Sequence, residues 1–190
     1  MYKNEFLAAI NTTQQWGLAP SFDGFRDTTP LDPAAIYAVI QSAIEHLSAN
    51  EVSQECFSVT LLIKDKLEAL LKEPLYYTLG YVRLGGKPTF YSSLNVLKGY
   101  LEQEGGYRRG VLLHAWLTTS SGAIIDASLL TTMAVIEKNP DWEGRCIIGH
   151  YDAHPSLSYH PQIVGLEYLS ACGFLVDTDI DVVMISEKGQ

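Results

Sequence analysis

The sequence contains few positively charged residues, and it nowhere gathers them into a cluster. Its 13 lysine and arginine residues face 22 aspartate and glutamate residues, which gives a formal net charge of -9. The one adjacent basic pair, Arg108-Arg109, is flanked by glycines, as in a solvated loop. Surfaces that bind nucleic acids or anionic membranes carry clustered Lys and Arg. The composition therefore predicts no nucleic-acid partner and no membrane partner, whereas a basic peptide could approach easily.

Cysteine is scarce, and long apolar runs are absent. Cys56, Cys146 and Cys172 are too few and too widely spaced for a disulfide framework or a cysteine-based zinc site. No apolar run approaches the ~20 residues of a membrane span. The N-terminus has neither the apolar core nor the cleavage site of a secretory signal. We therefore expect free thiols in a reducing compartment, hence a cytoplasmic protein or a bacterial effector secreted without a cleavable signal.

The chain is long enough to form one domain with its own core. Of its 190 residues 47% are hydrophobic, so a core can form without disulfides or a metal. No internal repeat and no linker rich in Pro, Gly or Ser divides it. We expect a single α+β domain over 1–190, with a helical part over 1–50, a catalytic core over 51–130, and C-terminal strands and a helix over 131–190.

Hydrophobic periodicity predicts helices first and a mostly antiparallel sheet afterwards. A period near 3.6 indicates helices over 3–16, 33–47 and 56–72, and Asp32 followed by Pro33 supplies the start signal of the second. Residues 50–55 are polar and turn-like. The later segments predict a strand over 75–84 ending at Gly85-Gly86, a helix from Ser92 or Ser93 to 104, and two strands around Ser120-Ser121-Gly122. After these come a loop through Asn139-Pro140, a strand over 146–151, a helix over 161–173 and a strand over 181–186.

Cys56 falls in the first turn of the third predicted helix. With Ser53 as the expected N-cap, its thiol lies at the positive end of the helix dipole, which favours the thiolate form. Thr60, Ile63 and Leu67 follow on the same stripe and are expected to pack on the sheet. A nucleophile also needs a base and a group that orients the base.

His114 and Asp126 supply these two residue types, on the strands around 120–122. His114 lies on the more mixed face of its strand, because the opposite face is uniformly apolar. A three-residue loop with a left-handed Gly122 sets residue 119 opposite 123 and His114 opposite Ser128. Asp126 is then a diagonal neighbour of His114 on the same face. A two-residue loop without a bulge would place the two side chains on opposite faces.

The order of these residues resembles that of a known family. A cysteine that opens a helix, then His-Ala-Trp on one strand and Ile-Ile-Asp-Ala-Ser on the next, is similar to the transglutaminase-like superfamily of papain-like cysteine proteases, over roughly 53–128. The stretch 114–128 is similar to the leader peptidases of lasso-peptide biosynthesis and to bacterial transglutaminase-like proteases. The short interval from His114 to Asp126 also resembles that of arylamine N-acetyltransferases. The resemblance implies a papain-like core with the nucleophile helix packed on the sheet.

The resemblance also implies the role of each residue. Cys56 corresponds to the nucleophile, His114 to the general base that later acts as an acid, and Asp126 to the residue that orients the imidazole. The backbone N–H of Cys56 is the expected oxyanion donor. Gln54 is a side-chain candidate for the same role, because papain-like enzymes use a glutamine there. No cofactor is implied.

Two classes of function fit these observations. The first is a cysteine-dependent hydrolase or acyltransferase that cleaves peptide, isopeptide or related amide bonds of a peptide or protein substrate through an acyl-enzyme. Within it we favour hydrolysis over transamidation, deamidation and acetyl transfer. The second is a noncatalytic module that keeps a degenerate transglutaminase-like fold to bind a protein partner. Selective labelling of Cys56 by iodoacetamide would favour the first class.

The remaining cysteine and histidine residues have structural interpretations. Cys146, in a predicted strand, and Cys172, before a helix-ending glycine, are expected to pack in the core. Residue types that can bind zinc or iron recur over 150–160, at His150, Asp152, His154 and His160. Their spacing matches no helical metal motif, and Pro155 and Pro161 indicate a loop. We expect a polar loop that borders the cleft of the candidate catalytic residues and holds no metal, with metal binding as the alternative.

Overall fold

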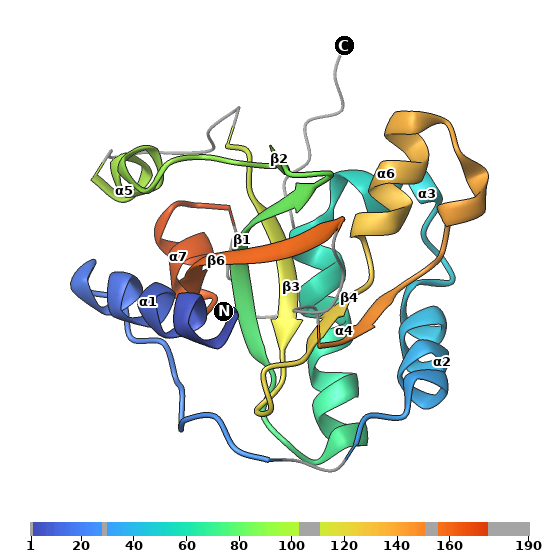
Figure 1. The fold of residues 1–190 in the computed structure, drawn as a ribbon, viewed down its shortest axis with the longest axis horizontal. Coiled ribbons are helices and arrows are strands. Elements are labelled where there is room, and N and C mark those ends of the chain that lie inside the picture. The colour runs from blue at the N-terminus through green and yellow to red at the C-terminus, as the bar shows by residue number, and fades with distance from the viewer. Residues whose placement is uncertain (1, 28–29, 103–110, 151–155, 175–190) are drawn as a thin grey trace.

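The protein has an α+β fold, described in a computed structural model for residues 2–27, 30–102, 111–150 and 156–174 (Figure 1). Four helices come first: α1 (Tyr2–Gln15), α2 (Pro33–Ile44), α3 (Ala49–Gln54) and α4 (Cys56–Leu71). They are followed by β1 (Tyr76–Leu84), β2 (Lys87–Thr89), α5 (Leu94–Glu102), β3 (His114–Thr118), β4 (Ile124–Asp126), α6 (Leu129–Glu137), the 3-10 turn η1 (Pro140–Trp142), β5 (Ile147–Gly149), β6 (Leu157–Val164) and α7 (Glu167–Ala171). The predicted α+β class is confirmed. None of the helices in these ranges is long and apolar enough to cross a membrane.

The strands form one sheet whose described pairings are all antiparallel, with β1 at its centre. The order is β2-β1-β3-β4-β5, and β6 also pairs with β1. Residues 76–80 of β1 pair with β3 and residues 82–84 pair with β2. Because β6 pairs along 78–84 on the other edge of β1, β2 and β3 share one edge, one after the other. The end of β2 therefore lies close to the start of β3, where His114 lies.

Two apolar cores attach helices to the two faces of the sheet. One core packs α2, α4, α5 and α7 against inward-facing residues such as Leu79 and Leu117. The other packs α1 and α6 against the opposite face, around Trp116. Neighbouring residues of β3 alternate between the two cores, as the pleat of a strand requires. Helix α4 thus covers one face of the sheet and α1 the other (Figure 1).

Polar side chains start the second and third helices. Asp32 begins α2 as predicted, because its Oδ1 accepts the backbone N–H of Ala34 at 3.0 Å. The turn predicted over 50–55 is wrong, since these residues lie in or next to α3. Ser48 and Glu51 form a capping box there: the N–H of Ser48 donates to Glu51 Oε2 at 2.8 Å, and the N–H of Glu51 donates to Ser48 Oγ at 3.3 Å. These bonds satisfy free donors at the helix start, so six mostly polar residues can form a helix.

Helix α6 replaces the loop predicted after the second strand. Its sequence is rich in β-branched residues, which favour strands when they are considered alone. The carboxylate of Asp126 accepts the N–H groups of Ser128 at 2.9 Å and Leu129 at 3.0 Å, and so initiates the helix. Leu129 and Met133 then bury one side of α6 in the core around Trp116.

Strand β6 corrects the prediction for 150–173. Residues 157–160 were expected in a loop and 161–173 in a helix, but 157–164 pair with β1 and only 167–171 are helical. Pro161 lies opposite Gly80, where the register shifts, and such a bulge tolerates a residue without an N–H donor. The strand predicted over 181–186 lies outside the described residues.

Candidate active site

Cys56 is the first residue of α4, and its side chain is half-buried. The N-cap is Glu55 rather than the predicted Ser53, because Ser53 still belongs to α3 and its hydroxyl donates to the carbonyl oxygen of Asn50 at 2.9 Å. Glu55 makes no side-chain capping hydrogen bond. The first N–H groups of α4 are therefore not occupied by a cap and can bind a developing negative charge next to the thiol.

Helix α4 holds Cys56 beside the start of β3. Strand β4 pairs with β3 only at Leu117 and Thr118. Further toward the start of β3, the hydroxyl of Thr60 donates to the carbonyl oxygen of Ala115 at 3.2 Å, and the Cys56 Sγ lies 4.0 Å from the carbonyl oxygen of Leu113. The first turn of α4 thus lies against the part of β3 that has no pairing with β4. The predicted packing of this helix on the sheet is confirmed.

The β3–β4 hairpin has the register that the sequence predicted. Leu117 lies opposite Ile125, and Thr118 lies opposite Ile124. The loop residues 120–122 are closed by the N–H of Thr119, which donates to the carbonyl oxygen of Ala123 at 2.9 Å. Gly122 has a φ of +86°, the left-handed conformation that a three-residue loop requires. The register places Asp126 opposite Trp116 and diagonal to His114.

His114 and Asp126 form a buried hydrogen-bonded pair. The imidazole Nε2 donates to Asp126 Oδ2 at 2.7 Å, and the two side chains are 2% and 0% exposed. The same carboxylate oxygen accepts the hydroxyl of Tyr159 at 2.8 Å. Its other oxygen accepts the two N–H groups that begin α6. Asp126 is therefore fixed from three directions, and it fixes the plane of the imidazole in turn.

Electrostatic interactions within this pair favour its charged form. Burial alone would lower the pKa of His114, but the charge of Asp126, the hydrogen bond to it and the contact with Cys56 raise that pKa to about 10. Burial would raise the pKa of Asp126, but the charge and hydrogen bond of His114, together with the N–H groups of Leu129 and Ser128, lower it. An imidazolium beside a carboxylate is therefore the favoured state near neutral pH.

The imidazole lies next to the thiol. Cys56 Sγ is 4.0 Å from the carbonyl oxygen of Leu113, the residue before His114. The interaction with Cys56 is among the causes that raise the pKa of His114. Since Asp126 engages Nε2, the nitrogen left for Cys56 is Nδ1. The three residues singled out in the sequence come from α4, β3 and β4, and Cys56 lies 70 positions before Asp126, so the fold brings them together.

Aromatic rings surround the imidazole, and their roles were missed in the sequence. Phe90 stacks on His114 with ring centroids 5.4 Å apart and planes 26° apart, and Trp116 stacks at 6.1 Å and 28°. The indole Nε1 of Trp116 donates to the hydroxyl of Tyr2 at 2.7 Å, which ties α1 to β3. Tyr159 was missed because its segment was predicted to be a loop. Trp116 could have been placed beside the imidazole from the sequence, because side chains two residues apart on a strand lie on the same face.

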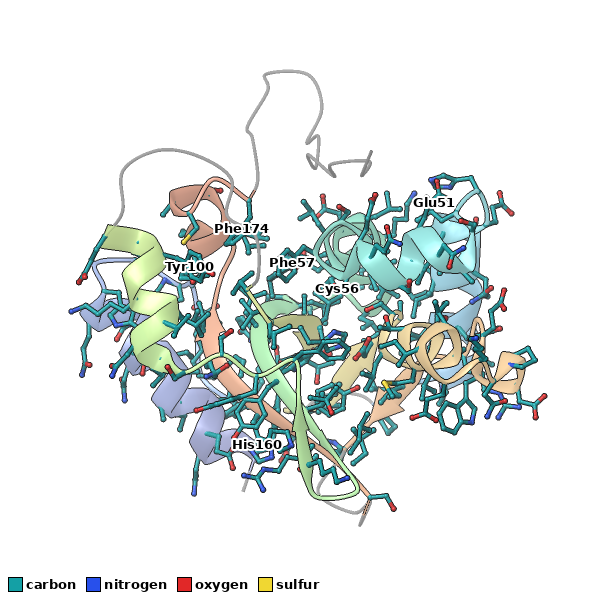
Figure 2. All side chains as sticks on the ribbon, turned by 90° about the horizontal axis from the view of Figure 1, so that it is seen from above. Glu51, Cys56, Phe57, Tyr100, His160 and Phe174 are labelled. Atoms are coloured by element: carbon teal, nitrogen blue, oxygen red, sulfur yellow. The ribbon has the colours of Figure 1, made fainter. Side chains whose placement is uncertain are left out.

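A row of aromatic residues extends from the thiol toward α5. Phe57 lies next to Cys56, Phe174 lies between Phe57 and Tyr100, and the successive ring centroids are 6.1 Å and 6.2 Å apart (Figure 2). Tyr77 donates its hydroxyl to the carbonyl oxygen of Phe57 at 2.9 Å. Burial and the charge of Cys56 hold the pKa of Tyr77 well above its ordinary value. The surroundings of Cys56 on this side are therefore apolar and aromatic.

The other candidates are Gln54 and the two remaining cysteines. Gln54 is the last residue of α3 and is exposed, so its role as an oxyanion donor stays a prediction. Cys172 is buried in the core, as expected. Cys146 packs against the same core. Burial and the charge of Asp126 raise the pKa of Cys146 to about 12, against the effect of a hydrogen bond with Gln41.

His160 is hydrogen-bonded to residues outside the Cys56 site. Its Nδ1 is hydrogen-bonded to Glu5 Oε2 at 2.8 Å and its Nε2 to Ser158 Oγ at 2.9 Å, and Figure 2 shows it well separated from Cys56. His150 is exposed at the end of β5, whereas residues 152 and 154 lie outside the described ranges. Across the described part of the chain, no three His, Cys, Asp or Glu residues are grouped as metal ligands.

Comparison with known proteins adds no relative to this geometry. No protein-family model matches the chain, and no curated protein or solved structure does either. The residues of the site are therefore the basis for its function.

Proposed function

We propose that the chain is a cysteine-dependent peptidase or amidase of the transglutaminase-like type, with Cys56 as the nucleophile. The proposal is carried by one observation, the buried His114 imidazole, which Asp126 holds by Nε2 while the opposite nitrogen remains for Cys56. A nucleophile, a base and a group that orients the base are the three parts that acyl transfer requires.

The reaction begins from a thiolate and an imidazolium. Cys56 Sγ attacks the carbonyl carbon of the substrate amide, and the carbonyl oxygen becomes an oxyanion. The uncapped N-terminus of α4, including the N–H of Cys56, offers donors for that charge. His114 donates its Nδ1 proton to the leaving nitrogen, the C–N bond breaks, and an amine leaves while a thioester forms on Cys56.

Hydrolysis returns the site to its initial state. Neutral His114 accepts a proton from water as the water oxygen attacks the thioester carbonyl, and the C–S bond then breaks to release a carboxylic acid. Throughout both steps Asp126 stabilises the imidazolium and keeps Nε2 protonated. Attack by an amine instead of water would give transamidation through the same thioester, and we favour water as the acceptor.

Iodoacetamide labelling tests the proposal without knowledge of the substrate. The native protein is treated with a limiting amount of reagent at pH 6, and modification at each cysteine is quantified by mass spectrometry. We expect Cys56 to react at least tenfold faster than Cys146 and Cys172, because thiolate is the reactive form. His114→Ala should remove this preference.

Two outcomes would count against a catalytic thiol. Equal labelling of the three cysteines would favour the noncatalytic protein-binding module instead. Undiminished labelling of Cys56 in His114→Ala would show that the imidazole does not activate the thiol. The matched control is His46→Ala, which removes an exposed histidine just after α2.

A further inference from the structure

Three residues other than glycine have a positive φ in the described part of the chain: Lys72 at 58°, Phe90 at 60° and Lys138 at 54°. Lys72 and Lys138 are the C-caps of α4 and α6, where a left-handed residue commonly closes a helix. Phe90 follows β2 and caps no helix. For a bulky residue, this conformation is strained and persists only where the surrounding structure imposes it.

The strained conformation directs the ring of Phe90 onto His114. Thr89, the last residue of β2, pairs with Val82, while His114 pairs with Gly80 on the same edge of β1. The chain must therefore turn sharply after Thr89. With the turn at Phe90, its ring lies nearly parallel to the imidazole, with centroids 5.4 Å apart.

The residues that follow hold this turn in place. Ser92 is buried, and its Oγ accepts the N–H of Leu112 at 3.1 Å. Its carbonyl oxygen accepts the side-chain amide of Gln162 at 2.8 Å. The segment after Phe90 is thus tied both to the residues before β3 and to β6. These bonds explain why Phe90 keeps a conformation that its side chain disfavours.

We propose that Phe90 is a positioning residue, whose ring keeps the His114 imidazole in the plane that joins Asp126 to Cys56 and keeps water away from the His114–Asp126 hydrogen bond. The inference rests on the proposed function, because the orientation of the imidazole has a role only if His114 is the catalytic base. Phe90 is only half-buried, whereas the His114 side chain beneath its stacked ring is 2% exposed, so the ring is part of what covers the imidazole. A hydrogen bond between charged groups is stronger where water cannot compete for either partner.

The test separates the ring of Phe90 from its backbone strain. Phe90→Gly removes both, Phe90→Leu removes the flat ring but keeps the strain, and Phe90→Tyr keeps both. Lys72→Gly and Lys138→Gly relieve the same strain at the C-terminal ends of α4 and α6 and serve as matched controls. The readouts are the solvent-exchange rate of the His114 Nε2 proton, by NMR of protein labelled with ¹⁵N-histidine, and the iodoacetamide labelling rate of Cys56.

We expect the Nε2 proton to exchange at least tenfold faster in Phe90→Gly and Phe90→Leu, and Cys56 to be labelled at least fivefold more slowly. Phe90→Tyr and the two lysine variants should stay within twofold of the wild-type protein on both readouts. Glycine accepts the positive φ without strain, so Phe90→Gly should remain folded, and Phe90→Leu provides the same comparison independently.

An unchanged exchange rate in folded Phe90→Gly and Phe90→Leu overturns the proposal, whatever the labelling rate. Faster exchange in the lysine controls would also overturn it, because the effect would then not depend on the ring. The exchange readout requires no enzymatic activity. Failure of the proposed function, seen as unselective labelling of the wild-type protein, is therefore distinguishable from failure of this inference.

Discussion

The hydroxyl of Tyr159 and the imidazole of His114 donate to the same carboxylate oxygen of Asp126, at 2.8 Å and 2.7 Å. Tyr159 is buried on β6, and its ring packs edge-on against Trp116 with centroids 5.0 Å apart. A strand from the far edge of β1 thus helps to orient the carboxylate. The position of Asp126 depends on the sheet as well as on its own hairpin.

Replacement of this hydroxyl should weaken both the site and the fold. We expect Tyr159→Phe to lower the free energy of unfolding by about 1.5–3 kcal/mol, the usual effect of losing a hydrogen bond to a charged group. A carboxylate held less firmly should slow Cys56 labelling by up to about tenfold, which corresponds to about 1.4 kcal/mol. Urea unfolding and labelling rates measure the two effects. Tyr37→Phe, at an exposed tyrosine, is the control, and equal results for the two variants would contradict the prediction.

Asp126→Asn should leave a folded protein with little activity. The amide oxygen can still accept the N–H groups that begin α6, but the side chain loses the charge that stabilises the imidazolium. We expect turnover, once a substrate is identified, to fall by about 10⁴, as when a triad histidine loses its orienting carboxylate. Until then, Cys56 labelling at pH 6 should fall toward the rate of an ordinary thiol. A folded variant with the wild-type rate would remove Asp126 from the mechanism.

Stability should decrease as the pH rises above neutrality. His114 has a pKa of about 10 in the folded protein and about 6.5 when unfolded, so its stabilisation is complete below pH ~6.5 and is lost as the pH rises through 10. The pKa of Asp126 is lowered on folding, so its contribution is present above its ordinary value and is lost in acid. From the shift of His114, the loss between pH 6 and 10 should be at most about 5 kcal/mol.

Urea unfolding at a series of pH values measures this dependence. His114→Gln should flatten the alkaline part of the curve, because it removes the group whose pKa changes. Other titrating residues are common to both proteins and cancel in the comparison. An unchanged alkaline slope in the variant would show that His114 is not protonated in the folded state near neutral pH.

Gly80 should not tolerate a side chain. A Cβ added there would meet the backbone carbonyl oxygen of His160, and it would lie 2.9 Å from a ring atom of Trp116. Because backbone on one side and a buried ring on the other leave no space, Gly80→Ala should lower the free energy of unfolding by about 2 kcal/mol or more. Gly99→Ala is the opposite control, since nothing lies within 4 Å of its Cβ and alanine favours the helix by about 0.5–1 kcal/mol. Equal stabilities of wild type and Gly80→Ala would refute the argument.

The parts of the site that could be predicted are those governed by local rules. The pairing of His114 with Asp126 follows from strand parity and a turn fixed by Gly122. The position of Cys56 at a helix start follows from a 3.6-residue period. Its cap was mispredicted because Ser48 begins a separate short helix, so the chain reaches Cys56 through Glu55 rather than from Ser53.

The unpredicted parts depend on contacts between distant segments. Tyr159 could not be placed because Pro161 made its segment resemble a loop, and only pairing with β1 reveals it as a strand. Phe90 requires a positive φ, which no sequence pattern predicts for phenylalanine. Helix α6 depends on the carboxylate of Asp126, which accepts the first N–H groups of the helix although its sequence context indicated a catalytic role.

The double use of Asp126 has a consequence for how such a protein could change over evolutionary time. Replacement of Cys56 or His114 would abolish the proposed chemistry without removing a helix cap, whereas loss of Asp126 would also release the start of α6 and the hydroxyl of Tyr159. A descendant that drifted from catalysis toward binding would therefore lose its thiol and imidazole first. The aspartate would persist as the last trace of the ancestral activity, maintained by selection for folding alone.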